Sequence, residues 1–242
     1  MKAFLLAAGH GTRLRPQTDT LPKCLLPVQG VPLLEIWLAL CRRHQISEVL
    51  LNTHAHSNAV VEFLGRWRNG VQVRVIEEPK LLGSAGTLLA NRKWVDSEEK
   101  FWIFYADVLT CMDLNGMLRF HSPSSAATIG VYEVPDPRRC GIVGLDEHDV
   151  LVSFVEKPAN PTSNLAFAGI MIATQQLLDV IPEKSRADIA FDVLPRLTGR
   201  TRAYHINEYL LDIGTKQNYE QAQQTWPGLA AVKPSYGDAG TR

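Results

Sequence analysis

The 242-residue sequence predicts an α/β fold built on a mixed, mainly parallel sheet. From the N-terminus to about residue 107, short apolar segments alternate with segments of helical apolar spacing, and the connections are short. Two apolar segments, LLAAG and FWIFY, are continuous, which is typical of strands buried on both faces. We therefore expect helices to cover both faces of the sheet.

The first half of the chain alternates strands and helices. The segment PLLEIWLALCRRH at 32–44 places its apolar residues three and four positions apart, which indicates a helix with one buried face. Parallel strands need such crossover connections, so the alternation favours a parallel arrangement. The strands are expected at 3–7, 48–53, 71–77 and 101–107, and the other helices at 58–68 and 85–91.

The second half of the chain has more strands and fewer helices, beginning after 113–121. Several of its strands alternate apolar and polar residues, which predicts antiparallel strands at the sheet edge or a small layer over its end. Strands are expected at 127–134, 141–147, 150–158, 166–173 and 202–208, and helices at 175–180, 189–197 and 215–225. We expect residues 1–226 to form one domain and the tail 227–242, rich in Pro, Gly and small residues, to be flexible.

The composition excludes several classes of partner. Twenty-five basic residues balance twenty-five acidic ones, so no overall field favours a nucleic acid or a membrane. The apolar run at the N-terminus is too short for a secretory segment or a membrane span. The scattered cysteines, Cys24, Cys41, Cys111 and Cys140, form no CxxC pair and suit a reducing compartment. We expect a cytoplasmic protein with no nucleic-acid or membrane partner, and a homo-oligomer is left open.

The loop LAAGHGTRLRP at 6–16 has the residues of an anion cradle. It begins like the dinucleotide fingerprint, but Leu14 stands where the third glycine is required, and no GK[ST] follows as in a Walker loop. Its glycines can turn backbone N–H groups toward one anion, while Thr12 and Arg13 add a hydroxyl and a charge. A tight turn with solvated arginines would explain the glycines alone. Lys23 follows between two prolines, which limit the volume it can sample.

The segment LAAGHGTRLRPQTDTLPKCLLPVQGVPLL resembles the sugar-1-phosphate nucleotidyltransferases, in which a GxGTRLRP loop precedes PKxLLPVxGxPLL. LGSAGTL, YADVL, VEKP, AGI and LDIGT follow in the order of that family. The resemblance, over about residues 1–220, implies a Rossmann-like three-layer α/β/α nucleotidyltransferase fold. It also implies transfer of a nucleoside monophosphate from a nucleoside triphosphate to a sugar 1-phosphate, with release of pyrophosphate.

The same resemblance assigns roles to individual residues. It implies that Arg13, Lys23 and Asp107 are catalytic and that Asp107 and Asp212 hold Mg²⁺. From the residues alone, Asp212 could instead be a helix cap, and Glu156 with Lys157 a solvated pair. The implied nucleotide-binding residues are Leu6, Ala8, Gly9, Gly11, Thr12, Arg13, Lys23, Gly83, Ser84, Ala85 and Gly86. The implied sugar-phosphate-binding residues are Gly141, Glu156, Lys157 and Gly169.

Substrate choice is indicated by where the chain keeps the family pattern and where it departs from it. The acidic stretch before LGSAG resembles the guanylyl-transferring members, which favours GTP and a mannose- or heptose-type sugar 1-phosphate. Ala106 replaces a usual glycine, Phe167 a usual asparagine and Cys24 a frequent proline, so we expect a sugar other than plain glucose or a weakened enzyme. The alternatives are a uridylyl-, thymidylyl- or cytidylyltransferase, or a non-catalytic regulatory homologue that binds sugar nucleotides.

Overall fold

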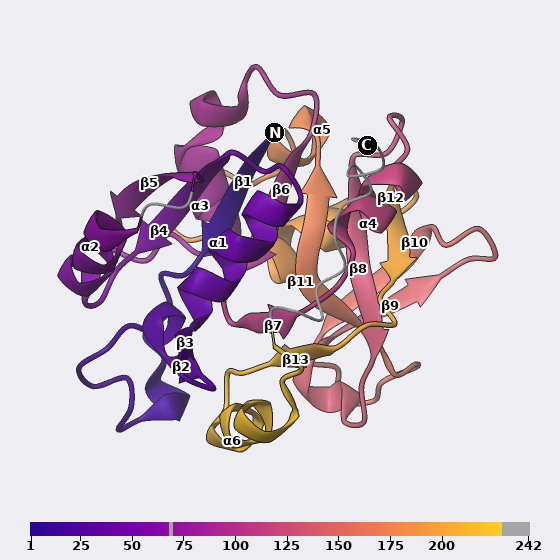
Figure 1. The fold of residues 1–242 in the computed structure, drawn as a ribbon. Coiled ribbons are helices and arrows are strands. Elements are labelled where there is room, and N and C mark those ends of the chain that lie inside the picture. The colour runs from indigo at the N-terminus through magenta and orange to yellow at the C-terminus, as the bar shows by residue number, and fades with distance from the viewer. Residues whose placement is uncertain (68–69, 229–242) are drawn as a thin grey trace, which may run out of the picture.

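The computed structural model describes residues 1–67 and 70–228 and has a mixed nine-stranded sheet within those residues. Four parallel strands form one half of it, so all four carboxyl ends lie at one edge. In spatial order they are β5 (Gln72–Glu77), β4 (Glu48–Thr53), β1 (Lys2–Leu6) and β6 (Phe101–Tyr105). Figure 1 shows them side by side with α1 (Leu33–Arg43) across one face.

The other half of the sheet is largely antiparallel, as the alternating strand patterns predicted. β11 (Leu165–Ala173) pairs antiparallel with β6 and with β8 (Ala127–Glu133), and β8 pairs parallel with β12 (Thr201–His205). The remaining strands are the antiparallel pair β9 (Gly141–Leu145) and β10 (Leu151–Glu156), which meets β11 at Ala166.

Two hydrophobic cores lie on opposite faces of the sheet, which confirms the three-layer prediction. Along β1, Ala3 and Leu5 pack in the core under α1, whereas Phe4 packs in the other core. The first core also contains residues of α2 (Ser57–Arg66), α4 (Leu114–Phe120) and α6 (Lys216–Thr225). The second contains residues of α3 (Ser84–Ala90) and α5 (Gln175–Leu178).

Two small antiparallel ladders were not predicted. One is the hairpin β2 (Pro27–Val28) and β3 (Val31–Pro32), whose turn residues Gln29 and Gly30 have φ of 49° and 84°. The other joins β7 (Val108–Thr110) to β13 (Leu210–Asp212). Figure 1 shows α6 beside the β2–β3 hairpin and directly after β13.

The structure also bears on the predicted helix at 189–197, the predicted tail and the question of membrane-spanning helices. The predicted helix 189–197 is a π-helical turn, Ile189–Val193, followed by a 3₁₀ turn, Leu194–Leu197, because Pro195 cannot donate a helical hydrogen bond. The predicted flexible tail lies outside the described residues from 229 onward. Within the described ranges, no helix has the length and apolar character needed to cross a membrane.

Candidate active site

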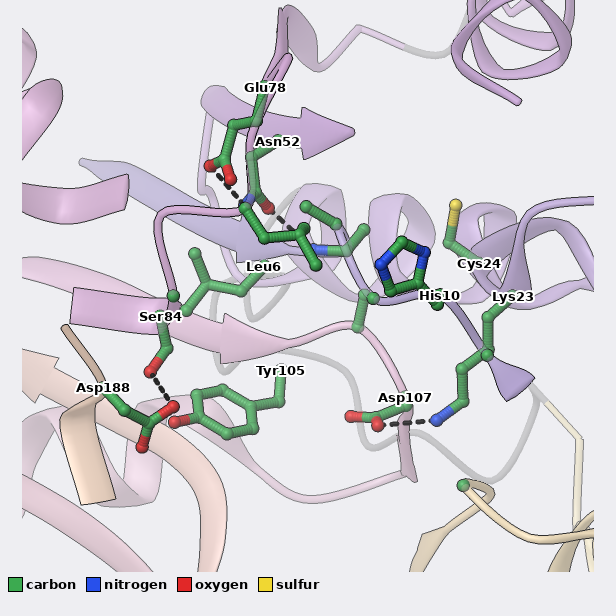
Figure 2. Close-up of a pocket in the computed structure, with 18 of the residues that line it drawn as sticks. Leu6, His10, Lys23, Cys24, Asn52, Glu78, Ser84, Tyr105, Asp107 and Asp188 are labelled. Carbon is green, nitrogen blue, oxygen red and sulfur yellow. Dashed lines mark hydrogen bonds and ion pairs between the residues drawn. The ribbon is translucent and has the colours of Figure 1, made fainter. Parts of the chain in front are cut away.

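A cavity of about 420 Å³ opens at the carboxyl ends of β1, β4, β5 and β6. Its walls come from the loops that follow these strands, from the segment around Lys23 and from residues 186–188. Figure 2 shows Asp107 and Lys23 on one side of this cavity and Ser84 and Asp188 on another. This is the position at which open α/β sheets bind ligands.

The predicted anion cradle follows β1 and lines the cavity from Leu6 to Arg13. Gly11 adopts φ 62° in front of the 3₁₀ turn Thr12–Leu14, and its carbonyl accepts a hydrogen bond from Thr18 Oγ1 at 2.8 Å. Leu14 is 1% exposed and anchors the loop in the protein interior. Leu14, which stands where a dinucleotide-binding loop has its third glycine, therefore helps to hold Arg13 at the cavity.

Lys23 and Asp107 form an ion pair at the same cavity, with Lys23 Nζ 2.6 Å from Asp107 Oδ2. Lys23 begins a 3₁₀ turn after Pro22, and Asp107 lies in the turn between β6 and β7. Burial alone would raise the pKa of Asp107, but the charge and hydrogen bond of Lys23 outweigh it and lower this pKa below its usual value. Asp107 is therefore held as a carboxylate.

Asp212 is brought beside Asp107 by the ladder between β7 and β13. Asp212 is in register with Val108, and the Ile213 amide donates to the Asp107 carbonyl at 2.9 Å. Burial and the negative charge of Asp107 raise the pKa of Asp212. The N-cap residue of α6 is Thr215, so the alternative prediction that Asp212 caps this helix is wrong.

Three charged groups converge at Gly214, two residues after Asp212. A Cβ at Gly214 would lie 2.7 Å from Asp212 Oδ1, 2.9 Å from Arg13 Nη2 and 3.2 Å from Lys23 Nζ. The Gly214 amide itself donates to Asp212 Oδ1 at 2.6 Å. The fold thus gathers two cations from the N-terminal region and the Asp212 carboxylate around one α-carbon with no side chain, and the Lys23 ion pair joins Asp107 to this group.

The two carboxylates fit the ligand preference of Mg²⁺. Mg²⁺ is bound through one or two carboxylates and completes its octahedron with water and phosphate oxygens. Among the described residues no cluster of three or more His, Cys, Asp or Glu side chains could form a closed metal cage. The repulsion that raises the pKa of Asp212 is also what a divalent cation between the two carboxylates would relieve.

A buried polar network forms another wall of the cavity around Glu78, which is 3% exposed. Glu78 Oε1 accepts hydrogen bonds from Thr87 Oγ1 at 2.5 Å and Asn52 Nδ2 at 2.9 Å, and Oε2 accepts from the Leu82 amide at 3.1 Å. Asn52 Oδ1 in turn accepts from the Ala7 amide at 2.8 Å. The network ties the anion cradle to the loop before α3 (Figure 2).

The loop before α3 is covered by a segment that sequence reasoning did not single out. The Ala187 carbonyl accepts from the amides of Ala85 and Gly86, and the Ala187 amide donates to the Leu82 carbonyl. A Cβ at Gly83, which has φ 79°, would meet the Ala187 oxygen at 2.3 Å. Gly83 and Ser84 line the cavity, whereas Ala85 and Gly86 face this segment.

The predicted sugar-phosphate residues lie together next to this cavity and are outside its lining. Lys157 Nζ lies 3.1 Å from Glu156 Oε1, and a Cβ at Gly141 would be 2.7 Å from Glu156 Oε2. Gly169, with φ 72°, packs against Tyr105, which does line the cavity. Phe167 packs edge-on against the same tyrosine, at 5.8 Å between ring centroids.

Several cavity residues were given no role from the sequence, although some of them lie inside the quoted motifs. Asn52 lies within a predicted strand, directly after its apolar run, and this position was the only feature of the sequence that could have indicated a role. Gly214 lies inside the quoted LDIGT motif, but its neighbours become visible only in three dimensions. The others are His10, Glu78, Leu81, Tyr105, Arg186 and Asp188.

Comparison with known proteins shows a family to which the chain belongs. The family model described as nucleotidyl transferase matches residues 2–227. The chain is 32% identical over 224 residues to the mannose-1-phosphate guanylyltransferase of Mycobacterium tuberculosis, covering 90% of this chain and 62% of that protein. It is 31% identical over 241 residues to the UTP–glucose-1-phosphate uridylyltransferase of Synechocystis, covering 92% and 62%.

A solved structure has a similar fold. HddC from Yersinia pseudotuberculosis superposes with a TM-score of 0.80 at 23% identity, over 93% of this chain and 99% of that one. The chain spans about three fifths of the length of the curated relatives it matches. With the glycine loop, Lys23 and the paired aspartates all within the matched residues, the chain belongs to the nucleotidyl transferase family.

Proposed function

We propose that this protein transfers a nucleoside monophosphate from a nucleoside triphosphate, preferentially GTP, to a mannose- or heptose-type sugar 1-phosphate. The observation that carries the proposal is the convergence of Arg13, Lys23, Asp107 and Asp212 at one end of a cavity whose wall is an anion cradle. Two polyanions must meet in such a reaction, and the cations are where charge has to be neutralised.

The reaction is an in-line displacement that needs no protein nucleophile. An oxygen of the sugar phosphate forms a bond to the α-phosphorus while the bond to the bridging oxygen of pyrophosphate breaks, and pyrophosphate leaves with that electron pair. Arg13 and Lys23 neutralise the triphosphate, and the backbone amides of Gly9, Gly11 and Thr12 orient it. Lys157 binds the sugar phosphate, and Glu156 accepts hydrogen bonds from sugar hydroxyls.

Mg²⁺ held by Asp107 and Asp212 would neutralise phosphate charge and orient the reacting oxygens. In the protein itself, Lys23 prepares this site because its ion pair keeps Asp107 ionised.

The preference for GTP is supported by Glu78. Guanine presents N–H donors on its Watson–Crick edge, and an ionised carboxylate is an acceptor-only group that complements them. Glu78 lines the cavity, and its Oε2, which accepts one hydrogen bond from the Leu82 amide, retains acceptor capacity, whereas Oε1 already accepts two hydrogen bonds. The guanylyltransferase of M. tuberculosis supports the same choice, whereas the uridylyltransferase of Synechocystis, at similar identity, supports UTP and glucose 1-phosphate as the second candidate.

A pyrophosphate-release screen tests the proposal. The four ribonucleoside triphosphates and dTTP are each combined with a panel of sugar 1-phosphates in the presence of Mg²⁺, with Asp107→Asn as the matched inactive control. We expect the highest rate with GTP and a mannose- or heptose-type substrate, and a loss of at least about a hundredfold in the control. Release with no pair would refute enzymatic activity, and a best rate with UTP would replace the base assignment.

A further inference from the structure

Arg186 lines the cavity at the end remote from the phosphate-binding cations. Arg13 and Lys23 both lie near Gly214, whereas Arg186 lies by Gly83, with its Cγ 3.1 Å from the position a Cβ of Gly83 would take. The side chain is exposed, and within residues 1–67 and 70–228 it has neither a hydrogen bond nor an ion pair. A guanidinium that borders a cavity and has no protein partner is available to a ligand.

The backbone that carries Arg186 is fixed in place. Its neighbour Ala187 makes three backbone hydrogen bonds to the loop before α3, through Leu82, Ala85 and Gly86. The next residue, Asp188, accepts from Ser84 Oγ at 2.9 Å, as Figure 2 shows, and Ser84 Oγ accepts from the Ile189 amide at 2.8 Å. The attachment of the Arg186 side chain is therefore preorganised beside Gly83 even though its tip is exposed.

The loop that contains Gly83 is also hydrogen-bonded to Glu78, the residue proposed to recognise the edge of the base. Glu78 Oε2 accepts from the Leu82 amide, so the Glu78 carboxylate and the Arg186 stem approach neighbouring residues of one loop. A planar base whose edge meets Glu78 would present its face to the side chain over Gly83. Guanidinium groups stack on aromatic faces, and their planar shape makes them better suited to this than an ammonium.

We propose that Arg186 stacks its guanidinium on the nucleobase and is a binding residue for the nucleotide, an inference that rests on the proposed function. The phosphate groups already have Arg13 and Lys23 at the other end of the cavity, so Arg186 contributes to base affinity and little to phosphate affinity. Its contribution is present before any transfer occurs, and it acts on nucleoside monophosphates as well as triphosphates.

Direct binding measurements test this assignment without depending on turnover. The triphosphate that the wild-type protein binds best and the matching monophosphate are titrated calorimetrically into the wild type, Arg186→Ala and Arg186→Lys. Arg186→Ala should weaken both nucleotides by a similar factor of about 2 to 30, the range expected for a cation–π contact. Arg186→Lys should restore only part of the loss because the ammonium is not planar.

Arg196→Ala is the matched control, since Arg196 is an exposed arginine of the same connection outside the cavity lining. It should bind both nucleotides as the wild type does. Unchanged binding by Arg186→Ala would overturn the inference. So would a loss confined to the triphosphate, which would make Arg186 a phosphate ligand, or a rise only in the KM for the sugar 1-phosphate. A wild-type protein that binds no nucleotide would instead refute the proposed function.

Discussion

At the scale of single residues, the site depends most directly on the absence of a side chain at Gly214. The atoms that a methyl group would meet there belong to Asp212, Arg13 and Lys23. The two cations end flexible side chains, so the fold can accommodate the methyl by moving them. The active-site geometry would change, however, because Asp212, Arg13 and Lys23 would all have to move away from Gly214.

Gly214→Ala should therefore lower kcat by about tenfold or more while leaving the unfolding temperature close to that of the wild type, since small displacements of reacting groups are costly. Steady-state kinetics and thermal unfolding measure the two effects. Gly199→Ala is the control and should retain kcat, because Gly199 is outside the cavity lining and has nothing within 4 Å of its Cβ position. A Gly214→Ala enzyme with normal kcat would show that the convergence at Gly214 is not needed.

Glu78 permits a test of base selection by a single substitution. Glu78→Gln keeps the shape of the side chain but replaces one acceptor oxygen by a donor amide. We expect kcat/KM for GTP to fall by about 10- to 150-fold relative to UTP, the range for a lost hydrogen bond to a charged group. Rates with the two triphosphates are compared in parallel, with circular dichroism to verify folding. An equal loss for both nucleotides would indicate that Glu78 acts only within its buried network.

At the scale of elements, the loop before α3 and the segment 186–188 form one rigid unit. Gly83 combines φ 79° and ψ 164°, which only glycine adopts readily, with an approach of the Ala187 oxygen that excludes a Cβ. The need for glycine at this position comes from packing of the protein against itself. The motif that resembles a nucleotide loop in the sequence is thus also a docking site for a distant segment.

Gly83→Ala should lower the free energy of unfolding by at least about 2 kcal/mol, through backbone strain and the clash with Ala187. Gly199→Ala, which has φ 74° and nothing within 4 Å of its Cβ, should cost only about 1 kcal/mol because strain is its sole penalty. Urea unfolding of both variants measures the difference. Equal losses would mean that the Ala187 contact relaxes without cost.

Helix α6 and the β2–β3 hairpin link the two ends of the chain that supply the site. Gln223 accepts from the Gln29 amide at 2.8 Å through Oε1 and donates through Nε2 to the Pro27 carbonyl at 2.8 Å. Tyr219 donates to the same carbonyl at 2.6 Å. The hairpin follows Lys23 and α6 follows Asp212, so these hydrogen bonds hold the flanks of both active-site segments together.

Gln223→Ala should reduce kcat by about threefold to tenfold and leave the KM for the nucleotide nearly unchanged, because it loosens the alignment of Lys23 and Asp212 without touching the base. Gln224→Ala is the control, as Gln224 is an exposed neighbour on the same helix. Kinetics at saturating substrate distinguish the two variants. A Gln223→Ala enzyme that matches the Gln224→Ala enzyme would assign the hydrogen bonds to helix docking alone.

At the scale of the whole molecule, stability should depend on pH through a buried histidine. His121 ends α4, and its Nδ1 lies 2.8 Å from Thr128 Oγ1. Burial, with a smaller effect of Lys100, lowers the pKa of His121 to about 4. In the unfolded chain the pKa of the same group is about 6.5. Between these values the unfolded state binds more protons than the folded state, so the folded protein loses stability as pH falls.

The free energy of unfolding should be unaffected by His121 above pH of about 6.5 and should decrease by up to about 3 kcal/mol as pH falls to about 4. Urea unfolding across this pH range measures the slope, and His121→Gln should flatten it. His148→Gln, at an exposed histidine, is the control and should keep the wild-type slope. A His121→Gln slope equal to that of the wild type would mean that the pKa of His121 is the same in the folded and unfolded states.

Much of the fold could be predicted because its longer elements have a recognisable apolar pattern, either a continuous run or a helical spacing. The continuous apolar runs of β1 and β6 and the helical spacing of α1 identified the parallel half and its ligand edge. The ladders β2–β3 and β7–β13 could not be predicted, since strands of two or three residues show no period. The 189–197 segment was predicted as one helix because periodicity does not separate α from π and 3₁₀ turns.

The sequence by itself determined the α/β class, the family motifs and the types of residue that the chemistry needs, because these are local properties of short segments. Only the tertiary structure decided that Asp212 lies beside Asp107, that Gly214 seats Arg13 and Lys23, and that Arg186 borders the cavity. The physical reason is that these groups come from distant parts of the chain, and their distances depend on ladder register and helix docking, which no local pattern records.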